Sequence, residues 1–282
     1  MKRVLQVVLM ACMLFTPTVF AWDQAGHKLI AHIAYRHLTL KAKINIDRLT
    51  DENPGQNQFP LNRFVFISTW ADWERARGNN IFNSWHYIDL PYADPGFTAK
   101  MPEAQNVVYG IERCAATLRQ PLHTTEEKRI GLKLLVHLVG DIHQPLHNVT
   151  RYNANHPTGD HGGNAYRIHS KTANNLHAYW DLGCGEFRRF QTPSLQTETA
   201  IQKYSVGIEE RYPQNSFIPA RLTTKPIEWA REGHDLAVLF VYELKEKETP
   251  SREYHYAGKQ IMEQRIAIAG YRLAAMLNQI YN

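Results

Sequence analysis

Apolar residues recur every three or four positions along most of the chain, which is the spacing of amphipathic α-helices. The first clear example follows His27, with apolar residues at Leu29, Ile30, Ile33, Ala34 and Leu38. Thr39 is suited to cap a second short helix. This pattern indicates a chain built mainly of helices.

Further helices are predicted in the middle and near the C-terminal end. In the middle they cover 63–77, 106–118, 126–144 and 172–182. The third of these should end before Pro145, because proline disfavours helical backbone in the residue before it. Near the end, one helix should run from about Pro226, a favourable first-turn residue, to Lys247. The last helix carries apolar residues at Ile261, Ile266, Ala269, Leu273, Met276 and Ile280.

Three long segments lack helical periodicity and are predicted to be loops: 91–102, 150–171 and 191–225. The second contains Gly162-Gly163-Asn164, and 165–169 could add a small hairpin strand. No repeat or linker divides residues 22–282. We therefore expect a mainly α, single-domain multi-helix bundle with long loops and at most a small β-hairpin.

The first 21 residues have the features of an export signal. Lys2 and Arg3 precede an apolar run, and Val19-Phe20-Ala21 places small residues at the cleavage positions. We predict a signal peptide at 1–21 and an exported protein, either periplasmic or secreted. Cleavage would make Trp22 the first residue, with an α-amine of pKa about 8 that could bind a metal ion. The alternative is that Trp22 merely follows the signal.

Composition adds little until the histidines are considered. The net charge of +5 falls to +3 without Lys2 and Arg3, a mild basicity that is compatible with a polyanionic substrate. After the signal, Cys114 and Cys184 could form one disulfide in an exported protein, but they are too few for a cysteine zinc site. The unusual number is the 14 histidines.

Two pairs of residues repeat a His-x-x-x-Asp spacing. His137 and Asp141 should point from one helix face, and His147 follows the Pro145 stop, where the chain can turn back. His177 and Asp181 repeat the spacing. One such pair is a weak signal, and ion pairs or helix caps would explain it. Two pairs, one extended by His147, favour a metal site.

Two further candidate ligands sit beside bulky aromatic residues. Asp72 lies in Trp70-Ala-Asp-Trp, and His86 lies in Trp85-His-Tyr. Either could instead be a surface carboxylate or a buried core histidine, and His143, out of phase with His137, could be supporting or structural. Imidazole mixed with carboxylate favours zinc or a similar divalent ion. The candidate ligands exceed what one ion needs, which suggests two or three ions.

The order of these motifs resembles that of the trinuclear-zinc, single-strand-specific nucleases. This class includes mung bean nuclease and nucleases S-one and P-one, within the zinc phospholipase C and P-one nuclease superfamily. The matching motifs are Trp-x-x-x-Gly-His at Trp22, Trp-Ala-Asp, Trp-His-Tyr and the two His-x-x-x-Asp pairs. The resemblance extends to Arg272-Leu-Ala-Ala-Met-Leu-Asn in the last helix.

The resemblance implies three Zn²⁺ ions held by nine residues. The implied sets are Asp72, His86 and His137; Trp22 and His27, with Asp141 bridging to the first set; and His147, His177 and Asp181. The third ion has three protein ligands, which is the usual number where one position stays open to water and substrate.

The same resemblance implies a hydrolase of single-stranded DNA and RNA that leaves 5′ phosphates and also acts as a 3′-nucleotidase. Asp72 would orient the attacking water, and Arg75 would contact the phosphate. Tyr87 would stack on a base, Asp89 would bind its edge, and Asn164 would contact substrate. A solvated Arg75, a packed Tyr87 and a plain turn at Asn164 are the alternatives. Nucleic acid and nucleotides are the expected partners, with no stable protein partner and no membrane-embedded segment.

Two other functions are compatible with the same ligands. A zinc phospholipase C shares the architecture and the N-terminal tryptophan, although the Tyr87 and Asp89 pair beside His86 favours nucleic acid. A protein that uses zinc structurally, or sequesters it, would have closed sites and no hydrolytic activity.

Overall fold

The computed structural model describes residues 22–50, 62–190 and 195–282. Its α-helices are α1 (Gln24–Arg36), α2 (Leu40–Thr50), α3 (Arg63–Ile67), α4 (Trp70–Ala76), α5 (Val107–Arg119), α6 (Thr125–Asp141), α7 (Leu176–Asp181), α8 (Leu195–Arg211), α9 (Pro226–Leu239) and α10 (Arg252–Tyr281). The 3₁₀ helices are η1 (Asn83–His86), η2 (Pro145–Asn148), η3 (Gly183–Phe190), η4 (Gln214–Ser216), η5 (Pro219–Leu222) and η6 (Val241–Glu243). The strands are β1 (Pro91–Ala93) and β2 (Thr150–Tyr152). The predicted signal peptide lies outside the described residues.

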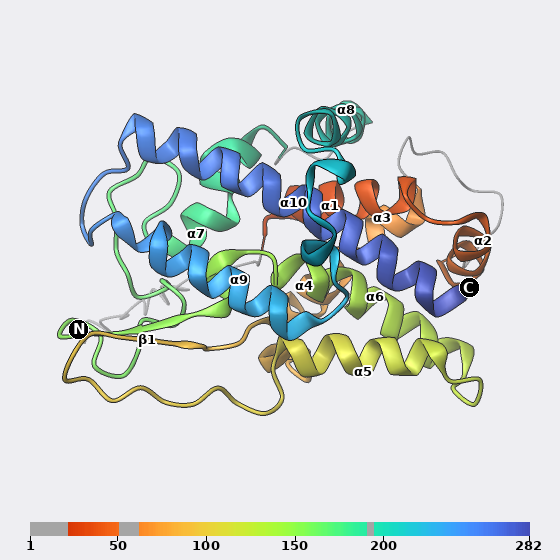
Figure 1. The fold of residues 1–282 in the computed structure, drawn as a ribbon, viewed down its shortest axis with the longest axis horizontal. Helices are drawn as coiled ribbons and strands as arrows, with labels where there is room; N and C mark the ends of the chain where they lie inside the picture. The colour runs from red at the N-terminus through yellow and green to blue at the C-terminus, as the bar shows by residue number, and fades with distance from the viewer. Residues whose placement is uncertain (1–21, 51–61, 191–194) are drawn as a thin grey trace, which may run out of the picture.

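The predicted mainly α architecture is confirmed, and α10 runs nearly the full length of the molecule (Figure 1). Helix α1 packs closely on it, because Gly270 has no side chain where a Cβ would lie 2.5 Å from Ile33 Cγ2. Helices α5 and α6 pack together below α1 and α10 in Figure 1, and α9 is joined to α10 by ion pairs of Glu232 with Arg265 and Arg272. No helix in the described ranges is both long enough and apolar enough to cross a bilayer.

Helix α6 is the central element of the fold. It begins with a capping box, in which the Thr124 hydroxyl accepts from the Glu127 amide and the Glu127 carboxylate accepts from the Thr124 amide. From Leu134 to Asp141 every residue is buried. The helix ends at Asp141, three residues before the predicted end, and the chain continues through η2.

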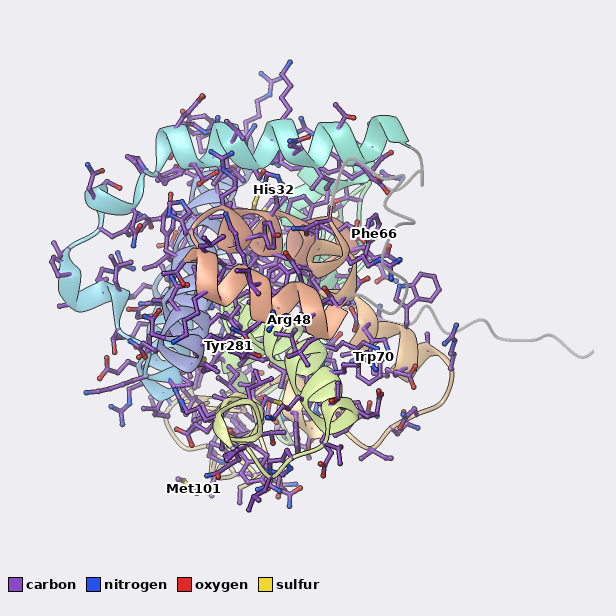
Figure 2. The ribbon with its side chains drawn as sticks, turned by 90° about the vertical axis from the view of Figure 1, so that its right-hand side faces the viewer. His32, Arg48, Phe66, Trp70, Met101 and Tyr281 are labelled. Atoms are coloured by element: carbon purple, nitrogen blue, oxygen red, sulfur yellow. The ribbon has the colours of Figure 1, made fainter. Side chains whose placement is uncertain are left out.

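The predicted helix 63–77 is two helices, with a break at Ser68 and Thr69. The Ser68 hydroxyl donates to the carbonyl of Val65, and its own carbonyl accepts from the imidazole of His137. The bond from His137 uses the Ser68 carbonyl, which in a continuous helix would accept from a backbone amide. A contact with a distant part of the chain therefore causes the break. Phe66 and Trp70 lie on one side of the molecule (Figure 2), with Lys28 and Lys133 over their rings.

The prediction that 191–225 is a loop is wrong, because α8 lies within it. Among the described side chains of α8, only Ile201, Ser205 and Ile208 are buried, so its apolar stripe is too thin to be recognised from the sequence. The predicted helices 172–182 and 226–247 are also shorter. Helix α7 begins only after its N-cap Asn175, and α9 ends at Leu239.

The small sheet is parallel and is not the hairpin that the sequence suggested. Strands β1 and β2 pair with Tyr92 opposite Arg151, whereas residues 165–169 contribute only an isolated bridge between Arg167 and Asn175. The pairing joins the segments 91–102 and 150–171, and it holds the end of η1 against η2. The fold therefore gathers segments that lie far apart in sequence at one end of α6.

Candidate metal centre and substrate pocket

Eight of the nine predicted metal ligands meet in three buried groups. Within each group one ligand atom per residue lies within 4.8 Å of the others. The groups are His27, His137 and Asp141; Asp72, His86 and His137; and His147, His177 and Asp181. His137 belongs to two groups, so these two form one continuous cluster.

Asp141 occupies the bridging position within that cluster. Helix α6 presents it on the same face as His137, whose Nε2 lies 3.2 Å from Asp141 Oδ2. The Nδ1 atom of His86 lies 2.9 Å from the same oxygen, and His27 Nε2 lies 3.3 Å from Oδ1. One carboxylate therefore faces three imidazoles from three separate segments.

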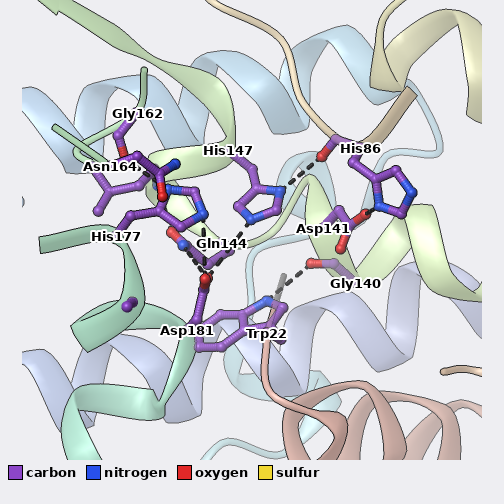
Figure 3. Close-up of polar contacts among 12 residues, drawn as sticks. Trp22, His86, Gly140, Asp141, Gln144, His147, Gly162, Asn164, His177 and Asp181 are labelled. Atoms are coloured by element: carbon purple, nitrogen blue, oxygen red, sulfur yellow. Dashed lines mark hydrogen bonds and ion pairs between the residues drawn. The ribbon is translucent and has the colours of Figure 1, made fainter. Parts of the chain in front are cut away.

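The third group is assembled by the turn after α6 and by α7. The Nε2 atoms of His147 and His177 lie 3.7 and 3.3 Å from the two oxygens of Asp181 (Figure 3). The side-chain amide of Gln144 donates to Asp181 Oδ1 at 2.7 Å. Asp181 is thus oriented from the same turn that carries His147.

Three of the histidines are oriented by backbone carbonyls. Nδ1 donates in each case: His137 to Ser68 at 2.8 Å, His147 to His86 at 2.7 Å, and His177 to Gly162 at 2.7 Å. With the proton on Nδ1, the Nε2 lone pair faces the cluster. This is the arrangement that metal-binding histidines adopt.

Two glycines leave room for the cluster. A Cβ at Gly140 would lie 2.5 Å from Nδ1 of His27. A Cβ at Gly26 would lie 2.8 Å from Cβ of Trp22. Close packing of α1 against α6 therefore depends on glycine at 140, and the position of Trp22 against α1 depends on glycine at 26.

Burial dominates the electrostatics of the centre. It lowers the pKa values of His27 and His86 to about 4 and raises that of Asp72 to about 6. Burial also acts to lower the pKa of His137, but Asp141 and Asp72 outweigh it and raise that pKa to about 9. Metal ions bind neutral imidazole and ionised carboxylate, the forms favoured for His27, His86 and Asp141, whereas His137 would give up its proton on binding.

Several buried polar atoms of the centre lack a hydrogen-bond partner among the described residues. They are Nδ1 and Nε2 of His27, both carboxylate oxygens of Asp72, Oδ1 of Asp141, Nε2 of His147 and Oδ2 of Asp181. Buried polar groups without partners are rare unless an ion or water satisfies them. The residues therefore fit bound metal ions, and mixed nitrogen and oxygen donors suit zinc.

Trp22, the ninth predicted ligand, lies between the groups. Its indole is fully buried, and Nε1 donates to the carbonyl of Gly140 at 3.0 Å. The next amide, that of Asp23, donates to the backbone carbonyl of Asp181 at 2.8 Å. The start of the predicted mature chain is thereby held beside both Asp141 and Asp181 (Figure 3).

A pocket of about 220 Å³ opens next to these groups. Its lining includes the four predicted substrate-side residues, Arg75, Tyr87, Asp89 and Asn164, together with His86, Leu146, His147, His161, Gly162 and His177. Tyr87 remains 42% exposed, which leaves its ring accessible. Arg75 Nη2 lies 3.8 Å from Asp72 Oδ1, so its charge is directed toward the metal centre.

Two of these side chains are also held by their own surroundings. The hydroxyl of Thr150 donates to Asp89, while burial raises the pKa of the Asp89 carboxyl. The Asn164 side chain donates Nδ2 to the carbonyl of His161 at 2.9 Å. Asn164 therefore both lines the pocket and closes a turn, so the two roles proposed for it are compatible.

His143 is structural rather than a ligand. Its Nδ1 donates to the carbonyl of Val139, and its Nε2 accepts from Arg272 at 2.9 Å. Arg265 donates to its carbonyl, and Glu232 binds both arginines. This buried network supports the turn between Asp141 and His147.

Other contributions to the site were not recognised from the sequence. Gln144 orients Asp181, as described above, and the amide of Asn148 donates to the carbonyls of Ile142 and Gln144. His161 lines the pocket. The only available signal for Gln144 and Asn148 was a polar residue within three positions of a predicted ligand. The two described cysteines are buried and free, so the possible disulfide is not formed.

Comparison with known proteins supports the geometry. The family model described as S1/P1 nuclease matches residues 22–282 and thus begins at Trp22. Endonuclease 2 of Arabidopsis thaliana is 26% identical over 298 residues, covering 99% of this chain and 97% of that protein. Nuclease S1 of Aspergillus oryzae is 24% identical over 288 residues, covering 93% and 92% respectively. The chain therefore belongs to the S1/P1 nuclease family, as a metal-dependent hydrolase of phosphodiester bonds.

Proposed function

We propose that the protein is an exported zinc endonuclease that cleaves single-stranded DNA and RNA, leaves 5′ phosphates and also acts as a 3′-nucleotidase. The observation that carries this proposal is the position of the three His/Asp groups, which adjoin a pocket containing Arg75 and an exposed Tyr87. The relatives named as endonucleases and as Nuclease S1 cover nearly the whole chain, which supports the same activity.

The donor inventory supports three zinc ions. Asp72, His86 and His137 would hold one, and His147, His177 and Asp181 another. His27 and the α-amine and carbonyl of Trp22 would hold the remaining ion, with Asp141 bridging. The amine becomes available only after cleavage behind Ala21, so this assignment rests on the export signal.

Zinc bound at these positions would polarise the phosphate and lower the pKa of water. One oxygen of Asp72 would serve as a ligand, and the other can accept a hydrogen bond from the attacking water and orient it. The guanidinium of Arg75 can donate to a non-bridging phosphate oxygen, for which its geometry is suited. Arg75 lines the pocket together with His86, and Asp72 belongs to the same ligand group as His86.

The preference for single strands follows from the Tyr87 and Asp89 side of the pocket. An aromatic face accepts any unstacked base, and stacking contributes about 1–3 kcal/mol per base. The Asp89 carboxylate, held by Thr150, can accept from N–H groups on the base edge. In a duplex both the face and the edge of the base are already occupied.

The test is to digest a fluorescent single-stranded oligonucleotide with mature protein that begins at Trp22. Cleavage is expected on the single strand and much less on its duplex; it should be lost after chelation and restored by Zn²⁺. The ends of the products should carry 5′ phosphates, and elemental analysis should give three zinc ions per chain.

The same preparation should be tested on phosphatidylcholine vesicles. Release of phosphorylated head groups without nucleotide release would instead establish a phospholipase C. Bound zinc without hydrolysis of either substrate would show that the metal is structural.

A further inference from the structure

His161 adopts an unusual backbone conformation at the edge of the pocket. Its φ is +54°, and Gly162 and Gly163 follow with φ values of +62° and +81°. This left-handed region is costly for residues with a Cβ and free of that cost for glycine. Three consecutive residues in it form a sharp turn that includes Gly162, whose carbonyl orients His177.

The backbone of the turn explains the conformation but does not require histidine there. The His161 carbonyl accepts from both the backbone amide and the side-chain Nδ2 of Asn164, at 3.3 and 2.9 Å. A glycine at 161 would form the same bonds at lower cost. Gly162, by contrast, must be glycine, because a Cβ there would collide with the carbonyl of Leu146.

The imidazole of His161 is exposed and lines the pocket that also contains Tyr87 and Asp89. Both residues line this pocket, and electrostatic interaction with His161 favours the ionised carboxylate of Asp89. Asp160 and Glu103, both acidic, also act on Asp89 and disfavour its ionised form. His161 thus supplies donor capacity in the same pocket as the acceptor Asp89.

We propose that His161 is a specificity-determining residue that binds the edge of the nucleobase stacked on Tyr87. Its imidazole N–H donates to a ring nitrogen or carbonyl of the base, while Asp89 accepts from an adjacent N–H group. Every nucleobase presents a donor beside an acceptor on one edge, but with different geometry, so the pair discriminates among bases. The inference rests on the proposed nuclease function.

The test is His161→Gly, assayed on oligonucleotides that differ only in the base at one position and on one with an abasic residue there. We expect KM to rise about threefold to tenfold for substrates with a base, the worth of one hydrogen bond. The increase should differ among the four bases. The abasic substrate should be cleaved equally well by the variant and the wild type.

The matched control is Lys247→Gly. Lys247 is exposed, has φ of +65° and is not among the residues lining the pocket, so glycine relieves similar strain away from the site. Both variants should unfold at the wild-type temperature or slightly above it, and only His161→Gly should change KM. Asparagine tolerates this conformation and can still donate a hydrogen bond. The KM of His161→Asn should therefore lie between those of the wild type and His161→Gly.

An equal rise in KM for abasic and base-containing substrates would overturn the inference and indicate that His161 contacts the phosphate or sugar. Unchanged KM on all substrates would overturn it as well. Failure of the wild-type protein to cleave any oligonucleotide would refute the nuclease function itself, and is therefore distinguishable.

Discussion

Three histidines of the centre, His137, His147 and His177, have Nδ1 bound by a backbone carbonyl and Nε2 directed to the cluster. His147 illustrates this arrangement, since its Nδ1 donates to the carbonyl of His86 while Nε2 is buried without a hydrogen-bond partner among the described residues. The orientation therefore persists without a metal ion, at the cost of an unsatisfied buried atom. Such a residue should contribute more to activity than to stability.

His147→Ala tests this expectation. Loss of a metal ligand should reduce nuclease activity at least about a hundredfold. The unfolding temperature of the metal-free protein should change little, because an unsatisfied polar atom is removed. The comparison variant is His123→Ala, which alters a partly exposed histidine next to the N-cap of α6 and should leave both quantities unchanged. Substantial residual activity in His147→Ala would remove it from the ligand set.

The ligands could be predicted from the sequence because their spacing reflects helical geometry. His137 and Asp141 share a face of α6, and His177 and Asp181 share a face of α7. The position of His161 depends instead on a loop whose path is set by tertiary hydrogen bonds. Local periodicity contains no information about such a path.

Among the elements, α6 connects core packing to the metal centre. It packs against α5, with Gly131 near Thr117 and Leu138 near Gly110, and its C-terminal turn carries Asp141 and adjoins α1. Its two interior glycines, Gly131 and Gly140, differ in their surroundings. The nearest atom to a Cβ at Gly131 would be 3.5 Å away, an ordinary contact, whereas Gly140 adjoins His27.

Gly140→Ala and Gly131→Ala therefore form a matched pair. Alanine at 131 should stabilise the protein by about 0.5–1 kcal/mol, because glycine is the poorer helix former. Alanine at 140 should displace His27, lower the zinc content by one ion and reduce activity strongly. Denaturant unfolding and elemental analysis would measure both effects. Normal zinc content in Gly140→Ala would contradict the assigned position of His27.

A second element-level feature is the contact of α9 and α10 with the turn after α6. Arg265 and Arg272 are fully buried and share Glu232. Burial acts to raise the pKa of Glu232, but the two arginines outweigh it and hold the pKa below its ordinary value. The stabilisation is therefore present above the pKa of the unfolded chain and is lost as pH falls through the lowered value.

Glu232→Gln should leave two buried cations without their counter-ion and destabilise the protein by about 3 kcal/mol or more. Glu228→Gln removes a carboxylate of the exposed pair with Lys225 and should have little effect. Urea unfolding of both variants at neutral pH would test this. A difference of less than about 1 kcal/mol would show that the network contributes little.

The same elements show the limits of prediction from hydrophobic pattern. Helices α1, α5, α6 and α10 were anticipated because each buries a broad apolar face. The break between α3 and α4 was missed because its cause is a partner 69 residues away in sequence. Helix α8 was missed because it covers the core with few apolar residues.

For the whole molecule, metal binding and folding should be strongly coupled. The ligands come from α1, α4, η1, α6, η2 and α7, so bound ions would connect segments across most of the chain. Chelation should lower the unfolding temperature by about 5–10 °C, as expected for the loss of about 2.7 kcal/mol of ligand stabilisation at a hundred times Kd. Calorimetry with and without chelator measures this change in unfolding temperature. The change should be smaller for His147→Ala.

Cleavage that exposes the α-amine of Trp22 should also determine how much zinc the whole molecule holds. A single alanine placed before Trp22 would convert the amine into an amide, and one zinc ion and most activity should be lost. The same residue added after Asn282 is the control, because the C-terminal residue is exposed. Full zinc content in the N-terminally extended protein would exclude the amine as a ligand.

The backbone carbonyls that orient the histidines have a consequence for how the sequence can diverge. Any amino acid supplies a carbonyl, so the acceptor at Ser68 survives substitution of its side chain as long as the chain keeps its path. Mutational drift can then alter much of the surrounding sequence while the geometry of the centre is inherited. This is consistent with relatives that span nearly the whole chain at only 24–26% identity.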